Sequence, residues 1–378
     1  MVDLPFDVDD PRLAAAAWSR VAEPPDQHAG ALVDNLGATE ALGWLTAVAA
    51  GRVDPGGEPW VRAVAGWVPR LENLDIRREL DTLDRLGGRL VLPGDPDWPT
   101  PLDDLGVERP LALWVRGGAI VQGRAVALVG ARACTSYGEH VAADMAVGLA
   151  EAGTTVVSGG AYGIDAAAHR GTLGVDGVTT AVLAGGVDRL YPVGNTRLLE
   201  AVTTSGAVVS EVPPGSVPSR NRFLARNRLI AALGAATVVV EAAWRSGALS
   251  TASRAAQLSR PVGAVPGPVT SMASAGCHRL MREQGAVCVT EAAEVLELVG
   301  VAGEHLTDDD RPVPAGLLDD LDPAARRVLD ALPLRGSAPV TNVARAAGLP
   351  ATEVRAALGH LELAGRARRT GSTWARSR

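Results

Sequence analysis

The stretch AVALVGARACTSYGEHVAADMAVGLAEAGTTVVSGG, residues 125–160, is the part of the chain that decides its fold class. Two short apolar runs, 125–131 and 154–160, flank a window in which apolar residues recur at helical spacing. Both runs are apolar without alternation, which is typical of strands buried on both faces. A strand, a helix and a second strand in this order predict a parallel pair joined by a right-handed crossover.

The same succession of strands and helices continues along the chain. A short strand is expected at Arg89, and further apolar runs lie at 179–186, 206–212, 236–242, 261–267 and 286–290, with helical windows between them. Repeated strand–helix units bury the sheet on both sides. Residues 89–300 are therefore predicted to form a Rossmann-like α/β domain with a doubly wound, mostly parallel sheet.

The two ends of the chain have different patterns. Residues 1–88 are rich in Ala and Leu at helical spacing and predict a small all-α domain of the SAM or helix-hairpin-helix kind. Residues 301–320 are acidic and contain Pro and Gly, which predicts a linker. In residues 321–378, three helical windows precede a hairpin-like segment, the order of a winged helix-turn-helix domain. This last part has 10 Arg against 4 acidic residues, whereas the net charge of the whole chain is −7.

Composition limits the chemistry that the 378 residues can support. The chain has no Lys, which excludes a Walker A phosphate loop and a Schiff-base mechanism. Its three Cys form no C-x-x-C pair, so we expect no metal, no disulfide framework and no cofactor. The N-terminus lacks signal-peptide features and no apolar run reaches the length of a membrane helix. We therefore expect a cytoplasmic protein that does not interact with membranes.

Loops rich in small residues follow several predicted strands. Ligands of doubly wound sheets bind at the carboxyl ends of the strands, where backbone N–H groups receive anions. Gly130 precedes Arg132 at one such end, Gly159 and Gly160 lie at a second, and AGGVDRLYP, residues 184–192, at a third. Each of these glycines on its own could do no more than allow a tight turn. Three glycine-rich loops at one edge of the sheet nevertheless favour an anion site. None has the G-x-G-x-x-G pattern of a dinucleotide site.

The segment SRNRFLARNR, residues 219–228, is the most informative for function. It places Arg220, Arg222, Arg226 and Arg228 around Phe223. Arg222 and Arg226 share one helix face, where like charges repel unless an anion lies across them. Guanidinium groups that bind phosphates, beside an aromatic ring that stacks on a base, are typical of a single-strand platform. The alternative is a solvated basic helix with Phe223 in the core.

A further strand-to-helix turn contains Ser246 and Gly247, which could hold a phosphate or cap the helix that follows. Catalytic signatures are absent from the sequence, which has neither G-x-S-x-G nor H-E-x-x-H. Asp165 and His169 are four residues apart, and we interpret this pair as a structural contact rather than a catalytic dyad.

Motifs that occur in one order from Asp97 to Gly285 resemble the DNA-processing protein A (DprA/Smf) family of bacteria. They include Asp97-Trp98-Pro99, LWVRG (113–117), SGGAYGID (158–165), LAGGVDRLYP (183–192), FLARNRLIA (223–231) and SGALSTA (246–252). The resemblance implies a dimeric, non-catalytic protein that binds single-stranded DNA and loads the RecA recombinase, chiefly during natural transformation. It also implies DNA contacts from Arg132, the Gly160 loop, Phe223, Arg226, Asn227 and Arg228.

The sequence departs from the family pattern at several places. Trp98 stands where the family usually has Tyr, and Ala131 replaces the usual Ser beside Arg132, which removes one hydroxyl contact to phosphate. Groove positions that are often Lys must here be Arg or neutral, which favours bidentate phosphate contacts. AEPPDQ, residues 22–27, lacks the Gly of a helix-hairpin-helix, which argues against duplex binding by the N-terminal part.

Two other functions would require sequence features that can be checked here. A nucleotide-processing phosphoribohydrolase on a related fold would carry P-G-G-x-G-T-x-x-E, but the corresponding turn is EAAWRSGALST, residues 241–251. A transcription regulator would read bases through its winged helix, whose presumed recognition helix offers only Arg355. The wing residues Arg366, Arg368 and Arg369 could contact phosphates, or the domain could bind protein, and the sequence leaves both open.

Overall fold

A computed structural model describes residues 4–71, 74–300 and 321–377 of the chain. The chain divides into two compact units, Met1–Thr307 and Asp308–Arg378. Residues 301–320, for which the sequence predicts a linker, lie outside the described residues. Each unit is therefore described by itself.

The larger unit is built on a nine-stranded sheet with the order β1-β2-β6-β5-β4-β3-β7-β8-β9. The strands are β1 (Gly88–Val91), β2 (Leu113–Gly117), β3 (Ala125–Val129), β4 (Thr155–Ser158), β5 (Thr179–Val182), β6 (Ala207–Ser210), β7 (Ala236–Val239), β8 (Val262–Ala264) and β9 (Val287–Cys288). Neighbours from β6 to β9 pair in parallel, and β2 and β1 extend one edge antiparallel. The predicted Rossmann-like, mostly parallel sheet is confirmed.

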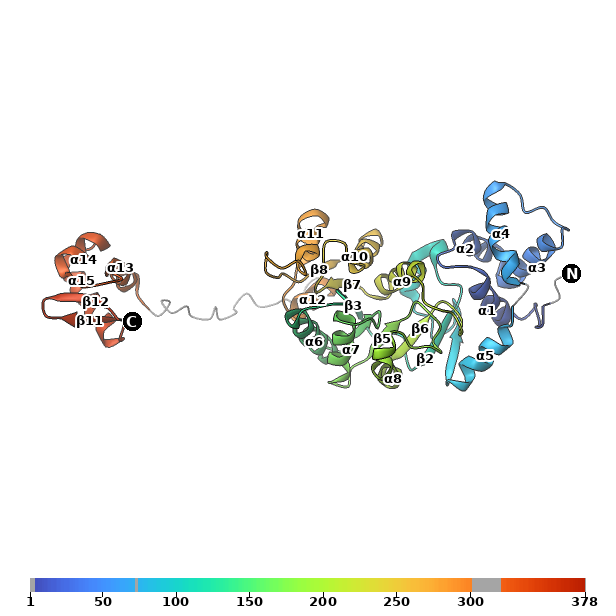
Figure 1. Ribbon diagram of the computed structural model, residues 1–378, viewed down its shortest axis with the longest axis horizontal. Coiled ribbons are helices and arrows are strands. Elements are labelled where there is room, and N and C mark those ends of the chain that lie inside the picture. The colour runs from blue at the N-terminus through green and yellow to red at the C-terminus, as the bar shows by residue number, and fades with distance from the viewer. Residues whose placement is uncertain (1–3, 72–73, 301–320, 378) are drawn as a thin grey trace. The chain divides into compact units, whose positions relative to one another are not determined.

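Helices cover both faces of this sheet (Figure 1). They are α6 (Ser136–Glu151), α7 (Ile164–Leu173), α8 (Thr196–Ser205), α9 (Arg220–Leu233), α10 (Ala248–Gln257), α11 (Ala275–Gln284) and α12 (Ala292–Val299), with short 3₁₀ helices at Thr100–Glu108 (η1) and Val193–Asn195 (η2). Val126 and Leu128 of β3 pack with α6, α7 and α12, whereas Ala127 and Val129 pack with α9, α10 and α11. Successive residues of a strand point to opposite faces, so an unbroken apolar run is what this two-sided burial requires.

The N-terminal helices share a core with the sheet. They are α1 (Pro11–Val21), α2 (Gln27–Leu36), α3 (Ala38–Ala49), α4 (Glu58–Leu71) and α5 (Ile76–Arg85), and they lie beside the β1–β2 edge (Figure 1). Trp18 and Trp67 meet edge to face with ring centroids 5.3 Å apart. Trp114 of β2 belongs to the same cluster and donates its indole N–H to Ser19 Oγ at 3.1 Å. Buried aromatic side chains thus join the helices to the sheet.

The smaller unit is a winged helix, as the sequence predicts. Its elements are α13 (Pro323–Ala331), β10 (Ala338–Pro339), α14 (Val340–Ala347), α15 (Ala351–Leu363), β11 (Ala367–Thr370) and β12 (Thr373–Arg376). β12 pairs antiparallel with both β10 and β11. Trp374 of β12 joins the apolar residues of the three helices in one core, which fixes the wing to the bundle.

The described residues contain neither a helix suited to a membrane nor a cluster of metal-ligating side chains. None of the helices there has both the length and the apolar character needed to cross a membrane. Within the same residues, His, Cys, Asp and Glu side chains form no group of three or more that could hold a metal ion.

His169 of α7 gives the larger unit a pH-dependent stability. It is fully buried, its Nδ1 lies 2.8 Å from Thr179 Oγ1, and its Nε2 has no hydrogen-bond partner among the described residues. It does not pair with Asp165, against the interpretation from sequence. Burial, helped by the charges of Arg226 and Arg170, lowers the pKa of His169 from 6.5 to about 3.

We expect acid to destabilise this unit through His169. Between pH 6.5 and about 3 the unfolded chain binds a proton on this ring and the folded chain does not. Stability that is present above pH 6.5 is therefore lost as pH falls, by about 1.4 kcal/mol per pH unit. Urea unfolding of the parent and of His169→Gln at several pH values measures this. The variant should have a shallower acid slope, while His140→Gln, at an exposed position on α6, should keep the parent slope; equal slopes for all three would contradict the assignment.

Candidate nucleic-acid interface

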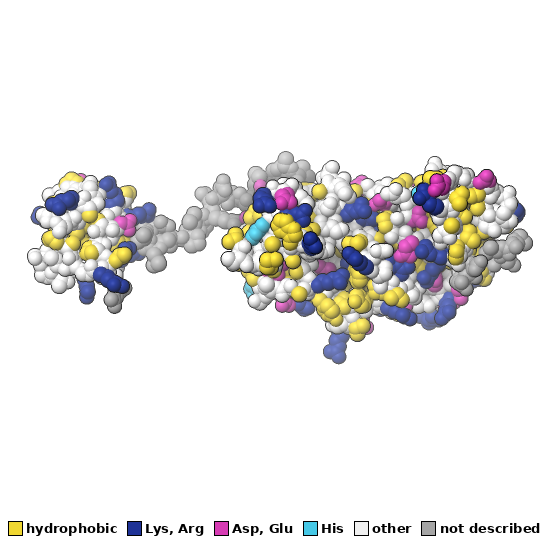
Figure 2. Space-filling view, turned by 45° about the horizontal axis from the view of Figure 1, so that its top comes forward, with side chains coloured by type: hydrophobic (Ala, Val, Ile, Leu, Met, Phe, Trp, Pro, Cys, Tyr) yellow, Lys and Arg dark blue, Asp and Glu magenta, His cyan; other side chains and the backbone are white. Residues whose placement is uncertain are grey.

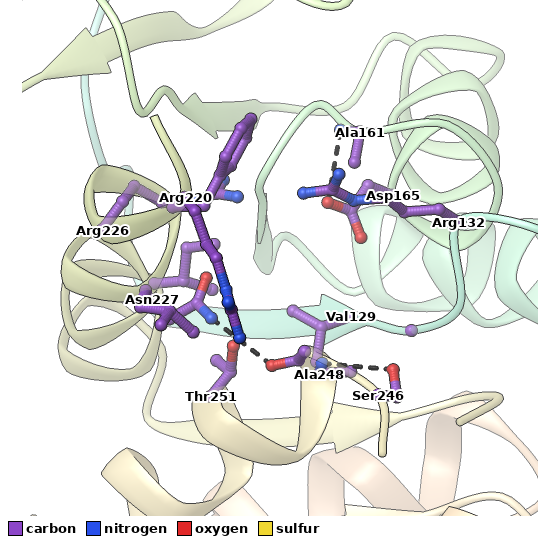
Figure 3. A pocket seen from close by; sticks show the side chains of 15 residues that line it. Val129, Arg132, Ala161, Asp165, Arg220, Arg226, Asn227, Ser246, Ala248 and Thr251 are labelled. Carbon is purple, nitrogen blue, oxygen red and sulfur yellow. Dashed lines mark hydrogen bonds between the residues drawn. The ribbon is translucent and has the colours of Figure 1, made fainter. Parts of the chain in front are cut away.

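A pocket of about 560 Å³ lies at the carboxyl end of β3. Four segments line it: the turn after β3, the loop before α7, helix α9 and the start of α10 (Figure 3). The lining residues are Val129, Gly130, Arg132, Ala161, Asp165, Arg220, Phe223, Leu224, Arg226, Asn227, Ile230, Ser246, Gly247, Ala248 and Thr251. This is the edge at which doubly wound sheets bind ligands.

Two exposed guanidinium groups face this pocket from different segments. In Figure 3, Arg132 lies beside Asp165 on one side and Arg220 extends from α9 on the other. The Cζ atom of Arg132 lies 4.6 Å from the centroid of the Phe223 ring, a cation–π contact. Neither Arg132 nor Arg220 forms an ion pair within the part of the chain that the structure describes. Both charges are therefore available to an anionic ligand.

Arg226 adds a third positive charge, but from within the protein. Its side chain is only 5% exposed, and its Nη1 donates to the Val182 carbonyl at 2.5 Å. Its Nε has no hydrogen-bond partner among the described residues. Burial, together with the charge of Arg132, lowers the pKa of Arg226 to about 10, against the opposing effect of Asp165. The group stays charged near neutral pH, and a buried charge with an unused donor favours an anion nearby.

The loop at Gly159 and Gly160 plays a different part from the one expected. Two of its amides are used within the protein, because the Gly159 and Ala161 N–H groups donate to Asp165 Oδ2 at 3.1 and 3.3 Å. Burial raises the pKa of Asp165, although Arg226 and these N–H groups oppose the shift. A Cβ on Gly159 would overlap the Arg226 guanidinium, and Gly160 has a φ of +67° that favours glycine. Both glycines are buried, and Gly159 leaves the space that the Arg226 guanidinium occupies.

Arg222 and Arg228, for which the sequence predicts contacts with DNA, do not line the pocket. Arg222 pairs with Glu23 of the loop after α1 at 2.6 Å. Arg228 is 2% exposed, binds Glu211 at 2.5 Å and donates from Nε to the Glu108 carbonyl. The repulsion predicted between Arg222 and Arg226 is thus relieved by carboxylates and carbonyls of the chain itself. We leave Arg222 and Arg228 out of the proposed contacts.

Ser246, Gly247 and Asn227 line the pocket from α10 and α9. Ser246 Oγ accepts the Ala248 N–H at 3.3 Å, so its hydroxyl serves the start of α10. The amide of Asn227 donates to the Gly247 carbonyl at 3.4 Å, which joins the two helices. The N-cap of α10 is Gly247, and Ser246 binds the first helical N–H from the residue before that cap, at a position that still faces the pocket.

Sequence reasoning missed two contributors to this pocket. Arg220 belongs to the basic segment but is not among the predicted site residues, and its place at the first turn of α9 turns it toward the pocket. Asp165 is interpreted from the sequence only as a partner of His169, although its position at the start of α7 after SGGAYG favours capture of loop amides. On the face drawn in Figure 2, arginines of the larger unit lie among hydrophobic side chains rather than apart from them.

Comparisons with known proteins agree on one family. The model of the family described as DNA recombination-mediator protein A matches residues 89–300, and that of the DprA winged helix domain matches residues 312–371. The putative DNA processing protein DprA of Mycobacterium tuberculosis is 47% identical, over 97% of this chain and 94% of its own length. The structure of DprA from Streptococcus pneumoniae has a TM-score of 0.64 at 31% identity, over 76% of this chain and 97% of that one. A structure of the Helicobacter pylori protein, concerned with its single-stranded DNA binding mode, has a TM-score of 0.51 at 26% identity, over 56% and 94%.

Proposed function

Because the chain belongs to the DNA-processing protein A family, we propose that its pocket at the carboxyl end of β3 binds single-stranded DNA. The observation that carries the proposal is that Arg132 and Arg220, both exposed and without an ion pair among the described residues, line one pocket together with Phe223, whose ring Arg132 contacts. Phosphates bind the guanidinium groups, and the aromatic ring adds the apolar surface that an unpaired base requires. The Helicobacter pylori relative, for which a single-strand binding mode is described, supports this choice of ligand.

The pocket favours binding over catalysis. Asp165 is the acidic residue of its lining, and both loop amides at Gly159 and Ala161 already occupy that carboxylate. Ser246 is engaged with the start of α10 and no His or Cys lines the pocket. We extend the proposal accordingly to a non-catalytic, cytoplasmic homodimer that loads RecA onto the strand, chiefly in natural transformation, as the family resemblance implies.

Binding measured at two salt concentrations tests the proposal. The full chain should bind a labelled oligothymidylate more tightly than a duplex of equal length, because a duplex does not offer its base faces. Its affinity should fall with salt with a log–log slope of about −2 or steeper, since Arg132, Arg220 and Arg226 would each neutralise one phosphate at roughly 0.7 per phosphate. A second experiment measures the rate at which RecA binds the strand, and the chain should increase this rate. Equal affinity for both DNA forms, or binding that does not depend on salt, would overturn the proposal.

A further inference from the structure

Four of the chain's five Phe and Tyr residues lie at the carboxyl edge of the sheet, and contacts around the loop after β5 link three of them, Phe223, Tyr191 and Tyr162. The sequence has only 2 Phe and 3 Tyr. Tyr191, in the loop after β5, has its ring centroid 5.9 Å from that of Phe223, at an interplanar angle of 53°. Tyr162, before α7, accepts the Gly194 N–H at 3.2 Å on its hydroxyl, so it contacts the same loop. In so aromatic-poor a chain, this grouping calls for a functional explanation.

The two neighbouring rings differ in how much of them a ligand can reach. Phe223 is half-buried and one of its faces is covered by the Arg132 guanidinium at 4.6 Å. Tyr191 is 45% exposed, next to the pocket but not part of its lining. A base that enters the pocket therefore meets a ring and a guanidinium together. A base that lies beyond Phe223 meets the open ring of Tyr191.

The loop that carries Tyr191 is held in place before any ligand arrives. Asn195, at its end, is buried and donates from Nδ2 to the Gly160 and Ala161 carbonyls, each at 3.0 Å. The Gly194 N–H bond to Tyr162 adds a second attachment. The same glycine loop that leaves space for Arg226 thus also positions Tyr191. A ring fixed in this way loses little conformational entropy when a base stacks on it.

We propose that Tyr191 is a second stacking position, which takes the unpaired base next to the one at Phe223. The strand then runs along the sheet edge from the start of α10, past Phe223, and leaves over the loop after β5. This inference rests on the proposed function and extends its site. Because the Tyr191 ring is uncharged, its contribution is independent of salt and of base identity.

Binding of thymidine monophosphate, and of oligothymidylates of about 4 to about 16 nucleotides, the range of known single-strand site sizes, tests the extension. Tyr191→Ala should weaken binding of the oligothymidylates about five- to a hundredfold, with an unchanged salt slope, and leave the single nucleotide, which reaches only the position at Phe223, at parental affinity. Tyr191→Phe should bind like the parent. Tyr137→Ala removes a Tyr of matched exposure, 44%, on α6 and should bind every length like the parent.

Phe223→Ala separates this inference from the proposed function, since it should weaken binding at every length. Photocrosslinking of 5-iododeoxyuridine strands to the parent should yield a Tyr191 adduct, and this measurement does not depend on the folding of a variant. If Phe223→Ala loses affinity while Tyr191→Ala binds every length like the parent, and no Tyr191 adduct forms, the second position is refuted and the pocket stands. Equal weakening of the single nucleotide and the oligothymidylates by Tyr191→Ala also refutes it. If Phe223→Ala and Tyr191→Ala both bind like the parent, the proposed function itself fails.

Discussion

Arg132→Glu is expected to weaken binding of single-stranded DNA roughly a hundredfold or more. Arg132 is exposed at the mouth of the pocket, over Phe223, and without an ion pair among the described residues. Its loss removes hydrogen bonds to a charged group, each of which contributes about 1.5–3 kcal/mol. The introduced carboxylate adds repulsion toward the phosphates. The log–log slope of affinity against salt should become shallower by about 0.7, the value for one phosphate fewer.

Fluorescence anisotropy with a labelled oligothymidylate measures both quantities. Arg62→Glu is the matched control, since Arg62 is an exposed arginine of α4 outside the pocket and undergoes the same reversal of charge. That control should retain parental affinity and slope at low salt. Equal losses from both variants would show that only the overall charge of the chain matters, which would contradict a specific role for Arg132.

Arg228→Ala is expected to lower the free energy of unfolding of the larger unit by about 3–5 kcal/mol. Arg228 lies in the core, where it binds Glu211 with both terminal nitrogens and the Glu108 carbonyl with Nε. Its removal would leave the Glu211 carboxylate buried without its partner. Urea unfolding followed by tryptophan fluorescence measures the loss. The double variant Arg228→Met with Glu211→Leu should recover most of it, because it removes both charges.

An ion pair of similar length on the surface provides the control for this second prediction. Arg170 and Glu139 lie 2.6 Å apart, and each side chain is about half exposed. Arg170→Ala should therefore cost less than about 1 kcal/mol. A similar cost for Arg170→Ala and Arg228→Ala would mean that the Arg228 pair does not behave as a buried one. DNA affinity is measured at a temperature where Arg228→Ala is fully folded. A loss of affinity there would mean that Arg228 does contribute to DNA binding.

The sequence was sufficient for the parallel part of the sheet because burial on both faces leaves an unbroken apolar run at each strand. Val126 to Val129 face two cores in alternation, and only an unbroken apolar run satisfies both. The winged helix was predictable for a similar reason, from three amphipathic windows and a hairpin. The antiparallel edge of β2 and β1 was not predicted, since strand direction depends on how the chain returns to the sheet and not on local composition.

The candidate site was predicted in part. Arg132, Phe223 and Arg226 do meet at one pocket, because the carboxyl ends of parallel strands lie at one edge. Arg222 and Arg228 lie in the same basic segment but turn to Glu23 and Glu211, partners far away in sequence. Helical spacing gives the direction of a side chain, and it does not reveal which carboxylate another element brings to it.

A crystal structure of the chain with a short oligothymidylate would show whether the strand enters the pocket at the end of β3. We expect a strand with a phosphate between Arg132 and Arg220, and with a base beside Phe223. A strand bound only at the winged helix or the N-terminal helices, with the pocket at the end of β3 empty, would contradict the account.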